Sequence, residues 1–275
     1  MFESISRRGF LALVPTVPFA FRPASPGLRR ARQSPPASSA PASPSASFPA
    51  HEPDVVKEMV AVSHGNLARV KELVSARPAL ARASWDWGYG DWETPIDAAS
   101  HVGNRPIAEY LIANGARPTL FTAAMLGQLD VVKALVAAAP GIQRTPGPHS
   151  ITLLRHAMAG GPRAQAVVDY LKSIEGADER PAEKPLTPED AKKLSGTYSF
   201  GLTQYSRIEM TANANNQMQF GRPGRFPRGL THLGSYEFVP VGAERVRIRF
   251  SEAAGMTLTV HDPDVVLTAK KVAGT

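Results

Sequence analysis

A repeated spacing of turn glycines and apolar pairs runs through the middle of this 275-residue chain. The glycines that mark the turns are Gly65, Gly103, Gly127 and Gly161. Eight and nine residues later the first three copies carry the apolar pairs Leu73-Val74, Leu111-Ile112 and Leu135-Val136, and the fourth copy, one residue longer, carries Tyr170-Leu171. This period predicts short helix pairs that bury their apolar faces only by stacking on neighbouring copies. Residues 51–176 are therefore expected to form an α-solenoid.

The best copy, TPIDAASHVGNRPIAEYLIANGA at 94–116, resembles an ankyrin repeat. Residues 122–132 match the middle of the same pattern, and residues 54–76 and 152–172 are degenerate matches. The resemblance implies about four repeats that bind a protein partner through a concave helical face and projecting hairpins. Asp97 replaces the family's usual histidine, and Thr119 and Leu153 replace its proline, so irregular caps are expected.

The first fifty residues predict export. Ser6-Arg7-Arg8-Gly9-Phe10-Leu11 precedes a short apolar run that ends at Phe21, and residues 1–22 resemble a twin-arginine signal. The run is too short to span a bilayer, so only transient membrane contact is expected. Residues 23–50 hold seven Pro, seven Ala and seven Ser, which predicts a disordered tether. We expect a periplasmic or secreted protein; the alternative is a basic leader without an export role.

All three tryptophans lie in SWDWGYGDWETP, residues 84–95, where the spacing between turn glycines is enlarged. An aromatic hairpin beside a concave helical surface predicts a binding element, because tryptophan is frequent among interface hot spots. Packing of the rings against the protein itself is the alternative. The predicted partner-binding residues are Trp85, Trp87, Tyr89, Trp92, Ser100, His101 and Met125.

Histidines are the candidates for metal or acid–base chemistry, because the chain contains no cysteine. His101 and His156 belong to corresponding first helices, and His149 lies shortly before His156. A shared metal site would also need Asp86, Asp91 or Glu93. Helix-capping or core hydrogen-bonding roles are the preferred interpretation, so we predict no metal ligand and no cofactor.

After the linker 177–193, the residue pattern changes to strands. Apolar and polar residues alternate with period two over 194–275, separated by Asn, Gly and Asp-Pro-Asp turns. The start, Leu194-Ser195-Gly196-Thr197-Tyr198, resembles the lipocalin-like β domains of secreted bacterial proteins, which implies an accessory or ligand-binding role. The predicted fold class is α + β in two domains: an α-solenoid of about four ankyrin repeats followed by a small antiparallel β-meander or half-barrel.

Two groups of arginines suggest an anion-binding surface, with a solvated, ion-paired face as the preferred alternative. They are Arg222, Arg225 and Arg228 in a Gly/Pro loop, and Arg245, Arg247 and Arg249 on one expected sheet face. The net charge of +7 does not indicate nucleic-acid binding, because six arginines and one glutamate place +5 of it in residues 1–50.

No familiar catalytic or nucleotide-binding motif occurs, so we predict no catalytic residue and no enzyme. The expected function is an exported, monomeric interaction scaffold for a protein partner. One alternative is a small-ligand or glycan binder that uses the tryptophan cluster or the β domain. A hydrolase accessory or cryptic hydrolase is the other.

Overall fold

The computed structural model describes residues 46–223, 227–253, 255–263 and 265–272. All of them belong to one unit of the chain, Ser45–Thr275. The predicted signal (1–22), most of the predicted tether and Arg225 lie outside the described residues.

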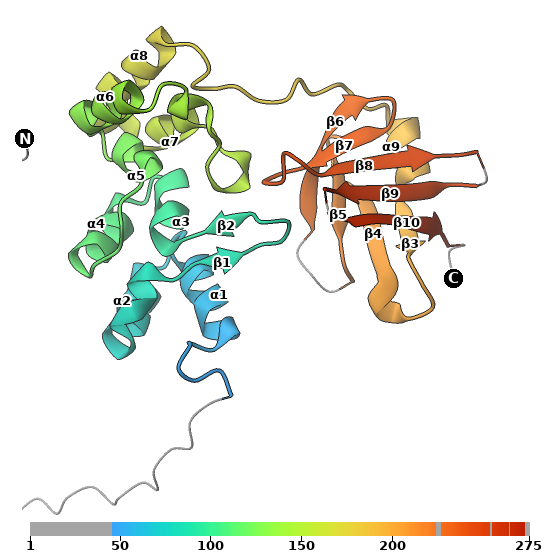
Figure 1. Cartoon of the computed structure of the whole chain (residues 1–275), viewed down its shortest axis with the longest axis horizontal. Coiled ribbons are helices and arrows are strands. Elements are labelled where there is room, and N and C mark those ends of the chain that lie inside the picture. The colour runs from blue at the N-terminus through green and yellow to red at the C-terminus, as the bar shows by residue number, and fades with distance from the viewer. Residues whose placement is uncertain (1–45, 224–226, 254, 264, 273–275) are drawn as a thin grey trace, which may run out of the picture. The chain divides into compact units, whose positions relative to one another are not determined.

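The helical part consists of helix pairs stacked in chain order (Figure 1). Their first helices, α1 (Pro53–Val62), α3 (Pro95–His101), α5 (Leu120–Met125) and α7 (Leu153–Ala159), pack successively against one another. The second helices are α2 (Leu67–Ala76), α4 (Arg105–Ala113), α6 (Leu129–Ala138) and α8 (Gln165–Ser173). Short 3-10 helices lie between them: η1 (Pro78–Arg82), η2 (Ile142–Arg144), η3 (Pro148–Ser150) and η4 (Gly161–Ala164). Within the described residues no helix combines the length and apolar character needed to cross a bilayer.

Polar caps determine where these short helices begin. Thr94, Thr119 and Thr152 each accept a hydrogen bond from the backbone N–H three residues on. Asn66 and Asn104 do the same at the start of α2 and α4. Each cap satisfies an N–H group that has no partner within its helix.

The turn glycines allow neighbouring helix pairs to approach closely. Gly103 and Gly127 have φ angles of 74° and 76°, in the left-handed region. A Cβ atom on Gly103 would lie 2.1 Å from the carbonyl oxygen of Ala159, and one on Gly127 would lie 2.3 Å from that of Arg163. Both glycines are therefore required by conformation and by packing.

A two-stranded hairpin, residues 85–93, separates the first and second helix pairs (Figure 1). Its strands are β1 (Trp85–Asp86) and β2 (Trp92–Glu93), with Trp85 opposite Glu93. At the tip, Gly88, Tyr89 and Gly90 all have positive φ, and the Asp86 carboxylate accepts a hydrogen bond from the Gly88 N–H. This tight turn carries the chain back so that Glu93 faces the helices.

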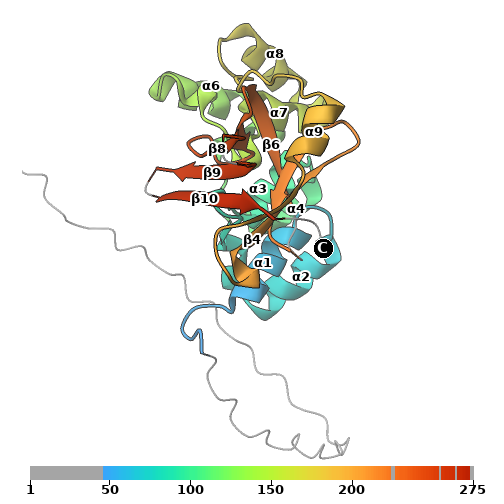
Figure 2. The same ribbon diagram turned by 90° about the vertical axis from the view of Figure 1, so that its right-hand side faces the viewer.

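The C-terminal strands form a closed antiparallel barrel, in which β8, β9 and β10 lie side by side (Figure 2). In chain order the strands are β3 (Gly196–Ser199), β4 (Arg207–Ala212), β5 (Met218–Gly221), β6 (Arg228–Gly234), β7 (Glu237–Pro240), β8 (Arg247–Ser251), β9 (Thr257–Asp262) and β10 (Val265–Lys271). Each pairs with its neighbours in sequence, and β10 closes the barrel on β3 with Lys270 opposite Ser199.

The predicted fold class is therefore wrong. A solenoid followed by a β-meander or half-barrel would leave two free sheet edges, whereas β3 and β10 pair and remove them. The closed barrel also has a filled interior, with Tyr198, Phe238 and Phe250 in its core. Helix α9 (Pro188–Leu194) adds Leu194 to that core, and the Tyr198 hydroxyl donates a hydrogen bond to the Leu194 carbonyl oxygen at 2.9 Å.

Candidate metal centre

Four side chains from separate segments converge beside the base of the hairpin. His64 lies in the turn after α1, Glu93 in β2, His101 at the end of α3 and His149 in η3. Glu93 Oε1 lies 2.9 Å from His101 Nε2, 3.4 Å from His149 Nε2 and 3.6 Å from His64 Nε2. The Nε2 atoms of His64 and His101 are 3.1 Å apart. One carboxylate oxygen and three imidazole nitrogens thus share one small volume.

Four of these separations, 2.9–3.6 Å, are close to those between ligand atoms of a tetrahedral transition-metal site, and the wider pairs would draw closer on binding an ion. Zn–N and Zn–O bonds of ~2.0–2.1 Å place neighbouring ligand atoms roughly 3.3 Å apart in a tetrahedron. One ligand atom from each of the four residues lies within 4.8 Å of all the others. Imidazole nitrogen and carboxylate oxygen are also the donors that Zn²⁺ accepts when no thiolate is present.

Further hydrogen bonds orient two of the four side chains. The Asp91 carboxylate lies 2.8 Å from His149 Nδ1 and also accepts the backbone N–H of His149 at 2.9 Å. Trp87 Nε1 donates to the second oxygen of Glu93 at 2.8 Å. These contacts leave Nε2 of His149 and Oε1 of Glu93 to face the shared volume, as second-shell partners of metal ligands commonly do.

The backbone of η3 brings His149 into place at a conformational cost. His149 and Ser150 have φ angles of 58° and 56°, an uncommon conformation for residues with a side chain. The two hydrogen bonds from His149 to Asp91 hold this conformation. Such strain is typical of functional positions.

Solvent exposure differs across the centre: the side chain of Glu93 is buried, whereas those of His64 and His149 are partly exposed. The side chain of Glu93 is 0% exposed and that of His101 is 10% exposed, whereas those of His64 and His149 are 32% and 27% exposed. A metal ion can therefore approach from solvent between these two histidines. The carboxylate that neutralises its charge lies at the protected end.

The electrostatics of the cluster favour an ionised Glu93. Burial favours its neutral form, but hydrogen bonds from His101 and His149 outweigh burial and lower the pKa of Glu93 to about 2. Burial also opposes protonation of His149, yet hydrogen bonds with Asp91 and Glu93 raise the pKa of His149 to about 9. Without a metal, a proton on His149 compensates the buried carboxylate, and a metal ion would displace that proton.

His156 lies next to the centre and is not one of the four candidate ligands. Its ring centroid is 6.4 Å from that of His101 and 4.7 Å from that of Phe121. The side chain is fully buried, Nδ1 lies 2.9 Å from the Thr152 carbonyl oxygen, and Nε2 has no hydrogen-bond partner. Burial lowers the pKa of His156 to about 4.

Acidification should therefore destabilise the metal-free protein partly through His156. Its pKa of about 4 lies below the unfolded value of 6.5, so the unfolded state binds the extra proton first as the pH falls. We expect His156 to cost on the order of 2–3 kcal/mol of stability between pH 6.5 and pH 4. Urea unfolding in the presence of EDTA measures this effect. As the pH falls from 6.5 to 4, the free energy of unfolding of the wild type should decrease more than that of His156→Leu. A difference independent of pH would contradict a neutral, buried His156.

The predicted partner-binding residues divide into four groups. Trp92 is 60% exposed on the hairpin, whereas Ser100 and Met125 are fully buried and out of a partner's reach. Trp85 and Tyr89 are partly buried, and Tyr89 packs against the barrel core. Trp87 and His101 instead belong to the candidate metal centre.

The described arginines of the two predicted groups make separate contacts within the protein. Arg247 and Arg249 of β8 both contact Glu237, at 3.5 and 2.5 Å, and Arg245 is exposed in the turn before β8. Arg228 Nη2 donates to the Trp87 carbonyl oxygen at 2.8 Å. Arg222 donates to the Tyr205 carbonyl oxygen at 2.5 Å.

Sequence reasoning did not single out His64 and treated Glu93 only as an accessory ligand. A signal for His64 was present, because it lies one residue before Gly65 and His101 lies two residues before Gly103, so both fall at the same turn of successive helix pairs. Stacked pairs bring matching positions together. Glu93 reaches the cluster because of the pairing register of the hairpin strands, and the sequence alone does not reveal that register.

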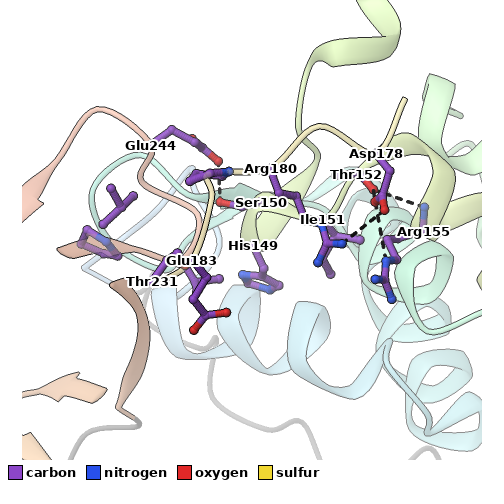
Figure 3. Close-up of a pocket in the computed structure, with 14 residues that line it drawn as sticks. His149, Ser150, Ile151, Thr152, Arg155, Asp178, Arg180, Glu183, Thr231 and Glu244 are labelled. Carbon is purple, nitrogen blue, oxygen red and sulfur yellow. Dashed lines mark hydrogen bonds and ion pairs between the residues drawn. The ribbon is translucent and has the colours of Figure 1, made fainter. Parts of the chain in front are cut away.

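His149 also borders a cavity of about 700 Å³ (Figure 3). Charged side chains along this cavity contact one another: Asp178 lies 3.6 Å from Arg155 Nε and 3.2 Å from Arg180 Nη2. The Ser150 hydroxyl donates to the Glu244 carboxylate at 2.5 Å. These pairings make the cavity a weaker candidate for ligand binding than the histidine cluster.

Fold and site together define a stack of helix pairs joined to a closed β-barrel, with three histidines and a glutamate gathered at a hairpin. No family model matches the sequence, and comparisons with curated proteins and with solved structures find no match. Functional inference therefore depends on the geometry of the molecule.

Proposed function

We propose that this protein binds one divalent transition-metal ion, with Zn²⁺ as the best fit, through His64, Glu93, His101 and His149. The observation that carries the proposal is the convergence of three imidazole Nε2 atoms on Glu93 Oε1 at 2.9–3.6 Å. Four protein ligands complete a tetrahedral shell, which is typical of structural rather than catalytic zinc. The ion would fix the hairpin to three helix pairs.

The direct test is titration of the EDTA-treated, dialysed full chain with Zn²⁺ in competition with a chromophoric chelator. We expect one ion per chain, together with release of protons as histidine ligands lose them. Co²⁺ in place of Zn²⁺ should give the intense visible absorption of a four-coordinate site. Absence of stoichiometric binding, or the weak spectrum of six-coordinate Co²⁺, would contradict the proposal.

Asp91 provides a test of the second shell. Asp91→Asn should weaken Zn²⁺ binding by about 10–100-fold, because the amide orients His149 less well and lowers the basicity of its ring. Asp130→Asn, an exposed change of the same type in α6, is the control and should leave affinity unchanged. Equal affinity in the wild type and both variants would show that Asp91 does not support a metal ligand.

A second candidate function is an interaction scaffold, and the exposed indole of Trp92 favours it. Trp92 directly precedes Glu93 in β2, so a metal ion bound to Glu93 would fix the backbone that carries the ring. Trp92→Ala should then abolish capture of a protein partner while leaving Zn²⁺ affinity intact. Export through residues 1–22, and hence a periplasmic or secreted location, is part of this proposal.

A further inference from the structure

The β7–β8 turn of the barrel, residues 241–246, packs against the segment that carries His149. The Gly242 N–H donates a hydrogen bond to Ser150 Oγ at 2.7 Å, and the Ser150 hydroxyl donates to the Glu244 carboxylate at 2.5 Å (Figure 3). Ser150 directly follows His149 in η3, and both residues have left-handed backbone angles. The barrel therefore contacts η3 at the residue next to a candidate metal ligand.

The same turn lies directly against Asp91, the carboxylate that orients His149. A Cβ atom on Gly242 would lie 2.3 Å from Asp91 Oδ2 and 2.7 Å from Oδ1, so a side chain larger than hydrogen has no room there. The Asp91 side chain is only 3% exposed. Its Oδ1 accepts the backbone N–H of His149 and its Oδ2 contacts Nδ1, so Asp91 cannot move away without releasing the histidine.

Arg228 of β6 holds Asp91 from the barrel side. Its Nη2 lies 3.4 Å from Asp91 Oδ2, and its side chain is 13% exposed. The guanidinium is itself fixed, because Nη1 donates to the Val241 carbonyl oxygen at 2.9 Å and Nη2 donates to that of Trp87 at 2.8 Å. One side chain thus joins the β7–β8 turn, the hairpin and the buried carboxylate, which needs a cation to compensate its charge.

We propose that the β-barrel controls the metal affinity of the centre: Gly242 and Arg228 hold Asp91 in place, and Asp91 holds His149. The inference rests on the proposed metal centre and extends it, because neither barrel residue is a candidate ligand. A shift of the barrel turn would displace the Asp91 carboxylate, and His149 Nε2 would then turn away from the ion. By thermodynamic linkage, a bound ion should equally tighten the contact between η3 and the barrel.

Gly242→Ala is the most direct test. The added methyl group would displace Asp91, so the Zn²⁺ affinity of the full chain should fall about 10–100-fold, the usual effect of losing a second-shell partner. Gly255→Ala in the β8–β9 turn is the matched control. Gly255 has a φ of 85°, against 78° for Gly242, and an added Cβ would have no atom within 4 Å. Both variants carry a similar backbone strain, so only Gly242→Ala should lose affinity in chelator competition.

A double-mutant cycle separates positioning through Asp91 from a general loss of structure. In an Asp91→Ala background the added methyl group meets no carboxylate, so Gly242→Ala should change Zn²⁺ affinity by less than about twofold. Urea unfolding with EDTA checks that each variant is folded. An undiminished loss of affinity in the Asp91→Ala background would overturn the proposed route.

Arg228→Gln tests the second barrel contact and leaves the turn glycine intact. It should weaken Zn²⁺ binding about fivefold or more, because the cation that holds Asp91 is lost. Arg249→Gln on β8 removes the same charge from a residue that contacts Glu237 and should bind Zn²⁺ like the wild type. Equal affinity of the two arginine variants would exclude Arg228 from control of the centre.

Amide hydrogen exchange tests the reverse effect in the unmodified chain. Zn²⁺ should slow exchange of the Gly242 N–H, which donates to Ser150, at least about fivefold. The Asn216 N–H in the β4–β5 turn, which donates to the Asn213 carbonyl oxygen, should exchange at the same rate with and without the ion.

The outcomes distinguish this inference from the metal proposal. Absence of Zn²⁺ binding by the wild type would contradict the metal centre itself. Zn²⁺ binding by the wild type with equal affinities in Gly242→Ala and Gly255→Ala, or with unchanged exchange at Gly242, would leave the metal centre standing and overturn control by the barrel.

Discussion

Replacing His101 with alanine is expected to weaken Zn²⁺ binding by more than ~100-fold, beyond the usual effect of losing a second-shell partner. His101 lies nearest to Glu93, at 2.9 Å, and only 10% of its side chain is exposed. Its loss would remove a ligand from the protected side of the centre. Chelator competition measures the change, with His261→Ala in β9 as a control outside the cluster.

A second variant separates loss of the ligand from loss of the fold. Glu93→Gln keeps the size of the side chain and an oxygen for Trp87 Nε1, but it removes the negative charge that the metal needs. Zn²⁺ at 100 times its dissociation constant should stabilise the wild type by about 2.7 kcal/mol. That stabilisation should vanish in both variants. Wild-type affinity in a folded His101→Ala or Glu93→Gln protein would remove these residues from the site.

Gly103→Ala should strongly destabilise the helical part. The added Cβ would enter a left-handed backbone position and lie 2.1 Å from the Ala159 carbonyl oxygen, so the fourth helix pair would have to move. Conformational strain of ~1–2 kcal/mol and overpacking of ~1–3 kcal/mol predict a loss of about 3 kcal/mol. For a domain of this size the loss corresponds to roughly 6–12 °C in melting temperature.

Gly65 provides the matched control for Gly103. It occupies the corresponding turn of the first pair, its φ is not in the left-handed region, and an added Cβ would have no atom within 4 Å. Gly65→Ala should change stability by less than ~1 kcal/mol. Equal melting temperatures for the two variants would show that close packing at Gly103 contributes little to stability.

Local patterns in the sequence locate elements better than they locate contacts between elements. The glycine spacing marks the turns of the helix pairs because each turn is determined within a few residues. Alternation identifies the strands, but it carries no information on whether Lys270 will lie opposite Ser199 and close the barrel. Closure depends on the register of the first and last strands, so the half-barrel expectation was wrong.

Because local patterns do not reveal contacts between elements, the sequence predicted only part of the candidate site. His101 and His149 stood out as individual residues, whereas no sequence motif joins them to His64 and Glu93. The register that places Trp85 opposite Glu93 and the left-handed backbone of His149 bring the four together. Both are features of the tertiary structure, and the sequence of a single helix pair does not determine them.

The spread of the four candidate ligands along the chain has a consequence for the order of assembly. His64 belongs to the first helix pair and His149 to the segment before the last, so the whole helical part must close before all four meet. A short nascent segment would offer at most Glu93 and His101 to an ion. The metal ion would therefore bind late in folding. During refolding with Zn²⁺, the hairpin should become resistant to proteolysis only after the helices have packed together.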